Sequence, residues 1–548
     1  MSAPAQPAAA DARAPARTWW PFVLVALAYA AVVAQNITLP GVYMDAVNPD
    51  YLAVRLLHRG TEPIGAWLLP GNYLFGRAPI LIAFYHGSLT TWFGLPVFAL
   101  FGTTVTGLRI AHALFGFAVL ASLYALLARG GAKPWQAALA CGALALDPGF
   151  TYAFRTQSYI TLAPAAFLFL SLYALQRAAD SAARNRWLFF AGWLYGLAVV
   201  GYFIYAFLLP AVVMAALWWT PAGARRGRGL LIAAAGAALG GVAYPLGYAL
   251  TAASLGGVAQ AWDYFQQTQR ALNAFSEQPD LAARFAHVAA TIASVYRNSF
   301  HHTLIFGAHG EVPGSGFKMA LLLGAPLLLW LRAEWQRPAP VLLRVLVACG
   351  VSFVAVALFF GTRLSGHHFM VLQPLAYGAF VLGLVAVART PRIGRTATAI
   401  IALPFAALVA LNVGGQVKES LRLQEVRGAG LYSDAINRLA ADLLARERRP
   451  FAYFPDWGLS MPVAFLTGGR IGMDSLENHE AARRMLCADR DVVVAVVNED
   501  RAARIGAWQR ALNWDAPAVE SYRQADGKVV FLLATFRGRR DGPGCQIG

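Results

Sequence analysis

The strongest constraint on this chain is a series of apolar runs that approach the length needed to cross a membrane. A helix needs roughly 20 apolar residues to cross about 30 Å of hydrocarbon, and about eleven runs approach that length. They are residues 19–34, 108–128, 135–146, 160–175, 187–205, 206–219, 230–250, 317–331, 341–360, 369–388 and 397–411. Because 58% of the residues are hydrophobic and only 13% are charged, we predict a mostly α-helical, polytopic membrane protein.

A further apolar run, 79–101, decides which side of the membrane each later loop faces. If this run does not span, the positive-inside rule places most short basic loops in the cytoplasm. Those loops contain Arg13, Arg17, Arg129, Lys133, Arg177, Arg184, Arg186, Arg225, Arg226, Arg228, Arg332, Arg337, Arg389, Arg392 and Arg395. We therefore predict that run 79–101 is interfacial or re-entrant. The net charge of +17 comes from these separate clusters, so it indicates topology and not a nucleic-acid surface.

The two ends of the chain differ in character. The first run contains Ala28-Tyr29-Ala30, a pattern typical of signal-peptide cleavage, but its long leading tail and the Trp19-Trp20 pair favour a retained anchor. Residues 1–414 are predicted to form the membrane domain, and residues 415–548 a small α/β domain of about 130 residues on the outer face. In this domain we expect a helix over 416–446 and strands over 451–454, 492–497 and 529–536. An oxidising compartment would permit a disulfide between Cys487 and Cys545, but the sequence leaves their pairing open.

The stretch YMDAVNPDYLAV, residues 43–54, places two carboxylates just after the first apolar run. Asn48-Pro49-Asp50 predicts a helix start, with Asn48 as N-cap and Asp50 beside the positive end of the helix dipole. We expect this juxtamembrane helix to lie on the bilayer surface and to run to about His58. Asp45 lies upstream of the cap, where a carboxylate tends to have a shifted pKa and a role in a site. We therefore predict that Asp45 is functional, with an ordinary loop carboxylate as the alternative.

A second carboxylate, Asp147, ends the third apolar run in ALALDPGFTYAFRTQSY. Asp-Pro is again a helix-cap pattern, so a purely structural role is the alternative. The predicted topology places Asp147 on the same outer face as Asp45, and the same loop brings Arg155. We predict that these residues share one pocket.

Basic residues on the outer face are informative because they oppose the positive-inside bias. Guanidinium and imidazole groups near the headgroup plane are suited to a lipid phosphate, although snorkelling to headgroups is the alternative for each residue. The predicted phosphate-binding residues are Arg155, Arg363, His367 and His368, and the secondary candidates for the site are Asp50, His86, Arg297 and His301.

The order of these parts resembles a known family. The segments that carry the likeness are MDAVNPDY, then RAPILIAFYHGSLTTWFG, then GLRIAHALFGFAVLASLYALLARGGAKPWQAALACGALALDPGFTYAFRTQSY, and later HHFMVLQPLAYG. From residue 19 to about residue 210 they resemble the GT-C membrane glycosyltransferases, which include protein O-mannosyltransferases and bacterial aminoarabinose transferases. The likeness is weak over residues 230–361, and none is found in the C-terminal domain.

The resemblance implies a function at the outer face of the bacterial inner (plasma) membrane. Such enzymes transfer a sugar from a polyprenyl-phosphate carrier to an acceptor hydroxyl, usually with inversion. Asp45 matches the family's catalytic base and Asp147 its second-loop acid. Asp147 would orient the acceptor or share a divalent ion, Mg²⁺, Mn²⁺ or Zn²⁺, with Asp45. The sugar and the acceptor, whether lipid, glycan or protein, are not specified.

Other functional classes remain as alternatives. A transporter predicts ionisable residues near the bilayer midplane and paired broken helices, whereas the acids here lie at the outer ends of runs. A lipid-linked-glycan ligase or phosphotransferase of another fold would also work at the outer face. A structural scaffold gives no reason for Asp45.

Overall fold

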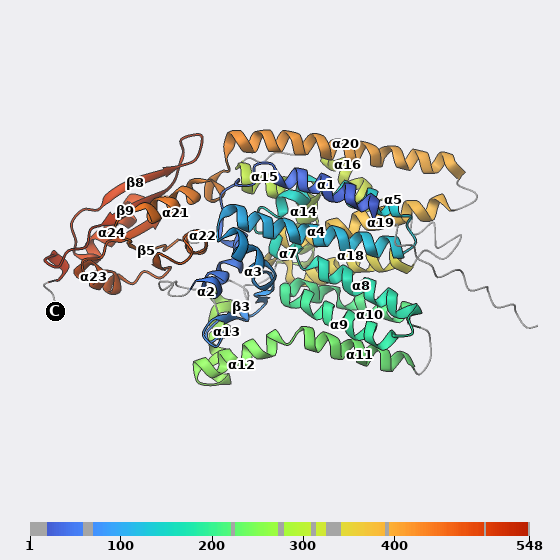
Figure 1. Ribbon diagram of the computed structural model, residues 1–548, viewed down its shortest axis with the longest axis horizontal. Coiled ribbons are helices and arrows are strands. Elements are labelled where there is room, and N and C mark those ends of the chain that lie inside the picture. Colours follow the sequence, from blue (N-terminus) through green and yellow to red (C-terminus); the bar gives the residue numbers. More distant parts are fainter. Residues whose placement is uncertain are drawn as a thin grey trace, which may run out of the picture.

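The computed structural model describes residues 19–58, 69–220, 225–271, 279–307, 314–324, 341–389, 394–456, 458–497 and 500–545. Its helices form an elongated bundle, and the C-terminal α/β domain lies at one end of that bundle (Figure 1). The main helices of the bundle are α1 (Trp20–Ala34), α4 (Val105–Arg129), α5 (Pro134–Ala145), α8 (Ala165–Asp180), α9 (Arg184–Gly201), α10 (Leu209–Trp219), α11 (Arg225–Gly240), α18 (Val341–Phe360), α19 (Leu372–Ala388) and α20 (Gly394–Val426).

Shorter elements connect these helices. They are η1 (Met44–Ala46), η2 (Asp50–Leu52), α2 (Ala53–Leu57), β1 (Tyr73–Leu74), β2 (Ala78–Pro79), β3 (Leu81–Ala83), β4 (His86–Gly87), α3 (Leu89–Phe101), α6 (Pro148–Ala153), α7 (Tyr159–Leu162), η3 (Phe203–Leu208), α12 (Ala243–Leu255), α13 (Val258–Ala271), α14 (Leu281–Tyr296), α15 (Ser299–Phe306), α16 (Ser315–Met319), η4 (Ala320–Gly324), η5 (Gly361–Arg363) and η6 (Gly366–Val371).

The mostly helical membrane architecture is confirmed, but the predicted number of spans is not. In the described parts of the chain, four stretches are long and apolar enough to cross a membrane: Val105–Arg129, Tyr159–Asp180, Val341–Arg363 and Gly366–Ala388. The pair α11 and α12, bent by 43°, gives a fifth if it counts as one span. Several predicted runs form shorter helices; extended backbone at Tyr202, for example, ends α9 within run 187–205. Run 317–331 is described only to Gly324.

Small residues allow α9 and α11 to pack backbone to backbone. A Cβ on Gly192 would lie 1.8 Å from the carbonyl oxygen of Ala233, and one on Gly240 would lie 2.1 Å from that of Trp193. Such close approach is typical of helix pairs in membranes, where small side chains let backbones meet.

Run 79–101 does not form one helix. Its first part lies in β2 and in the β3–β4 hairpin, and its second part is the 13-residue α3, which contains Pro96. A helix of this length spans about 20 Å, less than the hydrocarbon thickness.

The segment expected to form a juxtamembrane helix consists of η2 followed by α2. Asn48 is not its N-cap; Pro49 precedes η2 and no side chain caps it. Ala53 and Val54 are fully buried in a hydrophobic cluster shared with the C-terminal domain. The segment therefore packs against protein, because its apolar side chains find partners in that domain.

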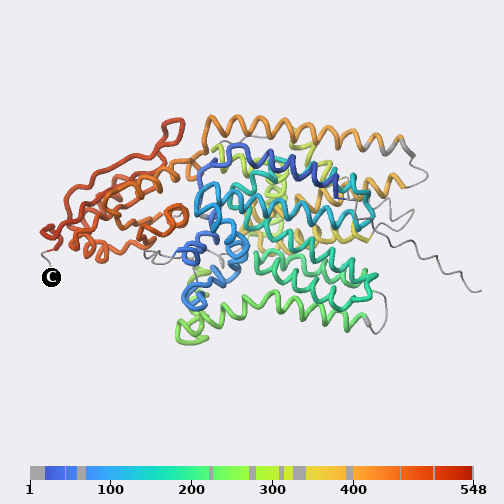
Figure 2. Tube along the Cα trace, viewed as in Figure 1, coloured from blue at the N-terminus to red at the C-terminus, as the bar shows by residue number. Residues whose placement is uncertain are grey.

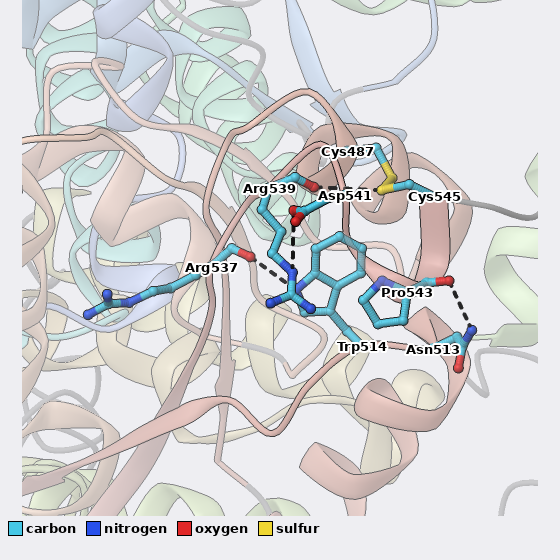
Figure 3. The surroundings of a disulfide bond; sticks show 8 residues. All are labelled: Cys487, Asn513, Trp514, Arg537, Arg539, Asp541, Pro543 and Cys545. Carbon is cyan, nitrogen blue, oxygen red and sulfur yellow. Dashed lines mark hydrogen bonds and ion pairs between the residues drawn. A yellow bond between two sulfur atoms is a disulfide. The ribbon is translucent and has the colours of Figure 1, made fainter.

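The C-terminal domain is built on a five-stranded sheet of order β6-β5-β7-β9-β8. Strands β6 (Gly472–Asp474), β5 (Phe451–Tyr453) and β7 (Val492–Val496) are parallel to one another. Strand β9 (Val529–Phe536) is antiparallel to both of its neighbours, β7 and β8 (Ala518–Arg523). Helices α21 (Ala435–Ala445), α22 (Ser460–Leu466), α23 (His479–Cys487) and α24 (Arg501–Leu512) pack around it. A disulfide joins Cys487 to Cys545 in η8 (Pro543–Cys545), close to Trp514, whose indole N–H donates to the Arg537 carbonyl (Figure 3).

The bundle and the domain are joined by a continuous helix and a shared core. Figure 2 shows α20 running along the bundle before the chain enters the domain. This helix extends over Gly394–Val426, so it passes residue 415 without a break. The helix expected over 416–446 is interrupted by η7 (Gly430–Tyr432), because Arg427 and Gly428 have positive φ angles of 57° and 92°. One hydrophobic cluster contains Ala46 and Val47 from the first loop together with Leu459 from the domain.

Ion pairs and hydrogen bonds show which helix ends lie together. Arg129 binds the Asp180 carboxylate at 2.5 Å, and Arg389 donates to the Gly131 carbonyl at 2.7 Å, so the ends of α4, α8 and α19 meet. Asp147 follows α5 at the other end of that helix. The basic helix ends at Arg129, Arg177 and Arg389 therefore lie at the end of the bundle away from Asp147.

Candidate functional site

A cavity of about 1210 Å³ is lined in part by α12 and α13, which lie near the end of the bundle that carries the α/β domain (Figure 1). Its wall combines side chains from the loop after α1, the β3–β4 hairpin, helices α12 and α13, and the segment η5–η6. Ile160 of α7, Tyr202 and Phe203 after α9, and Phe360 at the end of α18 complete it. Most of the wall is apolar, with a few charged and polar groups facing the interior. This combination is typical of small-molecule sites, and the volume is above their usual range of roughly 300–1,000 Å³.

Asp45 contributes the only carboxylate to the described wall of this cavity. It lies in η1, a single turn closed by the Ala46 amide, which donates to the Tyr43 carbonyl at 2.8 Å. The side chain is half-buried, and burial raises the pKa of Asp45 to about 6. Within the part of the chain that the structure describes, this carboxylate has no hydrogen-bond partner, so it is available to a ligand.

The segment η5–η6 brings Arg363, His367 and His368 to the same cavity. The Gln157 amide donates from Nε2 to Nδ1 of His367 at 3.1 Å. The Ser365 backbone N–H donates to Nδ1 of His368 at 3.1 Å. Because Nδ1 of His367 accepts the amide hydrogen, its neutral imidazole carries the proton on Nε2. Nδ1 of His368 also lies 3.2 Å from the Ser365 carbonyl oxygen, so its surroundings accommodate either tautomer. The segment therefore offers a guanidinium and two imidazole rings.

His86 also lines the cavity, although it was predicted only as a secondary candidate. It lies in β4, where its ring centroid is 5.0 Å from that of Tyr202. Burial lowers the pKa of His86 to about 3, so the side chain is neutral at physiological pH.

Helix α13 forms an apolar wall that the sequence interpretation did not single out. Val258, Ala261, Trp262, Phe265 and Gln269 line the cavity. Their spacing of three or four residues is the sequence signal that predicts one face of a helix.

Asp147 is buried elsewhere, in a polar network at the ends of α5 and α16. Lys318 lies 2.6 Å from its Oδ2, the Tyr377 hydroxyl donates to Oδ2 at 2.9 Å, and the Gly149 amide donates to Oδ1 at 2.9 Å. Asp147 is not among the residues that line the cavity. The structure therefore does not bring Asp45 and Asp147 together. Lys318 was missed because it stands inside an apolar run.

Arg155, predicted to bind phosphate, instead caps α1. Its guanidinium donates to the carbonyls of Val33, Gln35, Asn36 and Leu39. The side chain is 7% exposed and does not line the cavity. The carbonyls at the end of a helix have no hydrogen-bond donors within the helix, and the Arg155 guanidinium supplies donors to them.

Three secondary candidates also lie outside the cavity wall. Asp50 is fully buried, and its Oδ2 is 3.0 Å from His112 Nε2 and 2.9 Å from the Tyr159 hydroxyl. His301 pairs with the Ser158 hydroxyl at 3.0 Å, and burial with nearby Lys318 lowers its pKa to about 3. Arg297 follows α14 and lies beside the Asp147 network.

Asp45 and Asp147, predicted as possible ligands of one metal ion, lie in separate surroundings. Both oxygens of Asp147 already have protein partners, and Lys318 supplies the compensating positive charge. Among the described residues, no group of three His, Cys, Asp or Glu side chains is arranged to hold a metal ion.

Comparison with known proteins gives one family match and several structural matches. A model of the family described as dolichyl-phosphate-mannose-protein mannosyltransferase matches residues 85–244. No curated protein sequence matches the chain. ArnT from Cupriavidus metallidurans, solved with undecaprenyl phosphate, is similar with a TM-score of 0.59 and 14% identity, over 95% of this chain and 98% of that one.

Two further structures share the fold at low identity. The Archaeoglobus fulgidus oligosaccharyltransferase, solved with Zn and sulfate, has a TM-score of 0.52 and 13% identity, covering 93% of this chain and 72% of its own. The mycobacterial arabinofuranosyltransferase AftD has a TM-score of 0.50 and 15% identity, covering 95% and 40%.

Proposed function

Because the chain has the fold of the GT-C membrane glycosyltransferases, as its sequence resemblance predicted, we propose that it transfers a sugar from a polyprenyl-phosphate-linked donor to an acceptor hydroxyl. The similar ArnT structure contains undecaprenyl phosphate, which supports a lipid carrier of this class. The work would take place at the extracytoplasmic face of the bacterial inner membrane, an orientation that rests on the basic turns at the opposite end of the bundle.

One observation carries this proposal: the free carboxylate of Asp45 shares a large, mostly apolar cavity with Arg363, His367 and His368. A carboxylate is suited to receive a proton from an acceptor hydroxyl. A guanidinium and imidazole N–H groups are suited to a phosphate. An apolar wall is suited to an isoprenoid chain, which α13 and the residues Phe84 and Phe360 would contact.

The proposed chemistry is a single displacement. The hydroxyl oxygen of the acceptor attacks the anomeric carbon, and Asp45 accepts the proton of that hydroxyl. The bond from the anomeric carbon to the phosphate oxygen breaks. The polyprenyl phosphate leaves with the bonding electrons, and Arg363, His367 and His368 stabilise the charge that it gains. Attack opposite the leaving group inverts the anomeric centre. Asp45 then releases its proton to solvent.

Asp147, expected to be catalytic, and Arg155, expected to bind the phosphate, take no part in the chemistry proposed here. Asp147 is held by Lys318 and Tyr377, and Arg155 by four carbonyls of the α1 end. We propose that both residues are structural, because their polar atoms face protein partners.

The test is an assay of the purified protein in lipid nanodiscs. Undecaprenyl-phosphate-linked mannose, aminoarabinose and arabinose are supplied with candidate lipid and glycan acceptors, and release of undecaprenyl phosphate is measured. We expect Asp45→Asn to lower the rate by about 10²–10⁴-fold. Asp263→Asn is the matched control, since Asp263 is exposed on α13 and lies off the cavity wall; it should retain activity.

Two outcomes would contradict the proposal. Release of lipid phosphate that persists in Asp45→Asn would exclude Asp45 as the base. Movement of a labelled solute into sealed vesicles, without release of lipid phosphate from any donor, would favour the transporter alternative.

A further inference from the structure

Tyr432 lies where the chain passes from the bundle into the α/β domain. It is the last residue of η7, in the turn between α20 and α21, and is 3% exposed. It does not line the cavity, but it contacts the segment that carries Asp45 and also Gln157, whose side chain bonds to His367.

The first contact is with the segment that carries Asp45. The Gly41 amide donates to the Tyr432 carbonyl at 2.8 Å, and the ring of Tyr432 lies 5.3 Å from that of Tyr43. A Cβ on Gly41 would lie 1.9 Å from the Ser433 carbonyl oxygen, so only glycine permits the two backbones to meet here. The domain therefore holds the chain at residues 41–43.

The position of Tyr43 fixes the turn that bears the base. Its carbonyl accepts the Ala46 amide in η1, and its ring lies against Gly458, where a Cβ would approach within 2.4 Å. Gly458 has a φ of 116°, which favours glycine. Tyr43 is thus held between Tyr432 and the loop before α22, and Asp45 follows two residues later.

The second contact leads to the phosphate side of the cavity. The Gln157 backbone N–H donates to the Tyr432 hydroxyl at 3.1 Å, and the Gln157 side-chain amide donates to Nδ1 of His367 at 3.1 Å. The hydroxyl of Tyr432 therefore fixes Gln157, which orients His367 together with the Ser365 hydroxyl, 2.7 Å from the same Nδ1.

We propose that Tyr432 is a positioning residue for the transfer reaction: its carbonyl and ring hold the Asp45 turn, and its hydroxyl holds His367 through Gln157. This inference rests on the proposed function. It assigns to the C-terminal domain the task of fixing the separation between the base and the phosphate-binding group. Displacement of either group by a fraction of an ångström lowers the rate when reacting groups must be aligned.

The test compares three variants: Tyr432→Phe, Gln157→Ala and the double variant that combines them. Tyr432→Phe removes only the acceptor of the Gln157 amide and should lower kcat/KM about tenfold, since it leaves a buried donor without a partner. Gln157→Ala removes the contact to His367. If Tyr432 acts through Gln157, the double variant should be no less active than Gln157→Ala, because the shared route is already lost.

Tyr522→Phe is the matched control, because Tyr522 is a buried tyrosine of the same domain whose hydroxyl donates to Asp442 at 2.8 Å. It should lower the melting temperature as much as Tyr432→Phe does, with full activity. Amide hydrogen exchange at Gln157 should rise only in Tyr432→Phe.

The outcomes separate this inference from the proposed function. Absence of transfer by the wild type would contradict the proposed function and this inference with it. An active wild type with equal activity in Tyr432→Phe would overturn the positioning role alone, whatever the exchange at Gln157. Additive losses in the double variant would also overturn it, since Tyr432 would then act by another route.

Discussion

The ammonium of Lys318 lies 2.6 Å from Oδ2 of Asp147, and the two side chains are 5% and 0% exposed. Two opposite charges are thus removed from solvent together, and each neutralises the other. The pair joins the end of α5 to α16, which are far apart in the chain. This relationship gives a structural reason for a lysine inside an apolar run and for a carboxylate at the end of another.

Removal of either partner should therefore destabilise the protein. We expect Asp147→Ala or Lys318→Met alone to cost about 3–5 kcal/mol, because each leaves an uncompensated buried charge. The double variant Asp147→Asn/Lys318→Met should recover part of that loss. Thermal unfolding in nanodiscs measures the effect. Glu480→Gln is the control, since it breaks the exposed pair with Arg484 and should change stability little; an equal loss there would contradict the argument.

The disulfide between Cys487 and Cys545 closes a loop over a sequence separation of 58 residues. Cross-linking over such a distance restricts the unfolded chain and stabilises the folded domain by about 4 kcal/mol in the chain-entropy model. Reduction, or the change Cys487→Ser/Cys545→Ser, should lower the melting temperature of the domain. Transfer activity of the protein that remains folded should persist, because neither cysteine lines the cavity. A melting temperature insensitive to reductant would contradict this expectation.

Local patterns in the sequence were sufficient where one segment determines its own structure. The predicted run 341–360 coincides with α18, the predicted strand 529–536 coincides with β9, and Asp45 was singled out by its place after the first run. Hydrophobic length and alternation are properties of single segments, so a single sequence reveals them. Strand β6 was missed because three residues give no alternation.

Partners from distant segments could not be predicted in the same way. Asp147 and Lys318 are separated by 171 positions, and Arg155 reaches carbonyls more than 115 positions away. The predicted position of Asp147 and Arg155 in an outer loop was compatible with side chains that line a cavity or with side chains in a buried polar network. Only the packing of α5, α16 and α19 decides between them, because it determines which polar atoms meet protein and which meet open space.

Arg155 and Arg363 were predicted to bind the same phosphate, and the structure assigns them different surroundings. Arg155→Met should lower stability by about 2–4 kcal/mol, since one buried and three part-buried carbonyls lose their donor, and should leave the donor KM unchanged in the folded fraction. Arg363 is exposed and lines the cavity. Arg363→Met should leave the melting temperature nearly unchanged and raise the donor KM about tenfold. A raised donor KM in Arg155→Met, at unchanged stability, would contradict the structural role.

The pKa of Asp45 predicts opposite effects on activity and stability. Burial raises this pKa from 3.8 to about 6, so the folded protein binds the proton more tightly than the unfolded chain does. Stability therefore falls as the pH rises from about 4 to about 6, and above that range the charged carboxylate costs up to about 3 kcal/mol. Activity requires the charged form, so kcat/KM should fall tenfold per pH unit below about pH 6.

Asp45→Asn removes the charge without changing the shape of the side chain. The variant should melt at a higher temperature than the wild type at pH 7.5, and the difference should vanish at low pH, while transfer activity is lost throughout. Melting curves and initial rates across pH 4–8 measure both effects. Asp263→Asn again serves as the control, and it should change neither the melting temperature nor the initial rate. A variant less stable than the wild type at pH 7.5 would show that the Asp45 carboxylate stabilises the fold, which would remove the reason to regard it as a base held for a substrate.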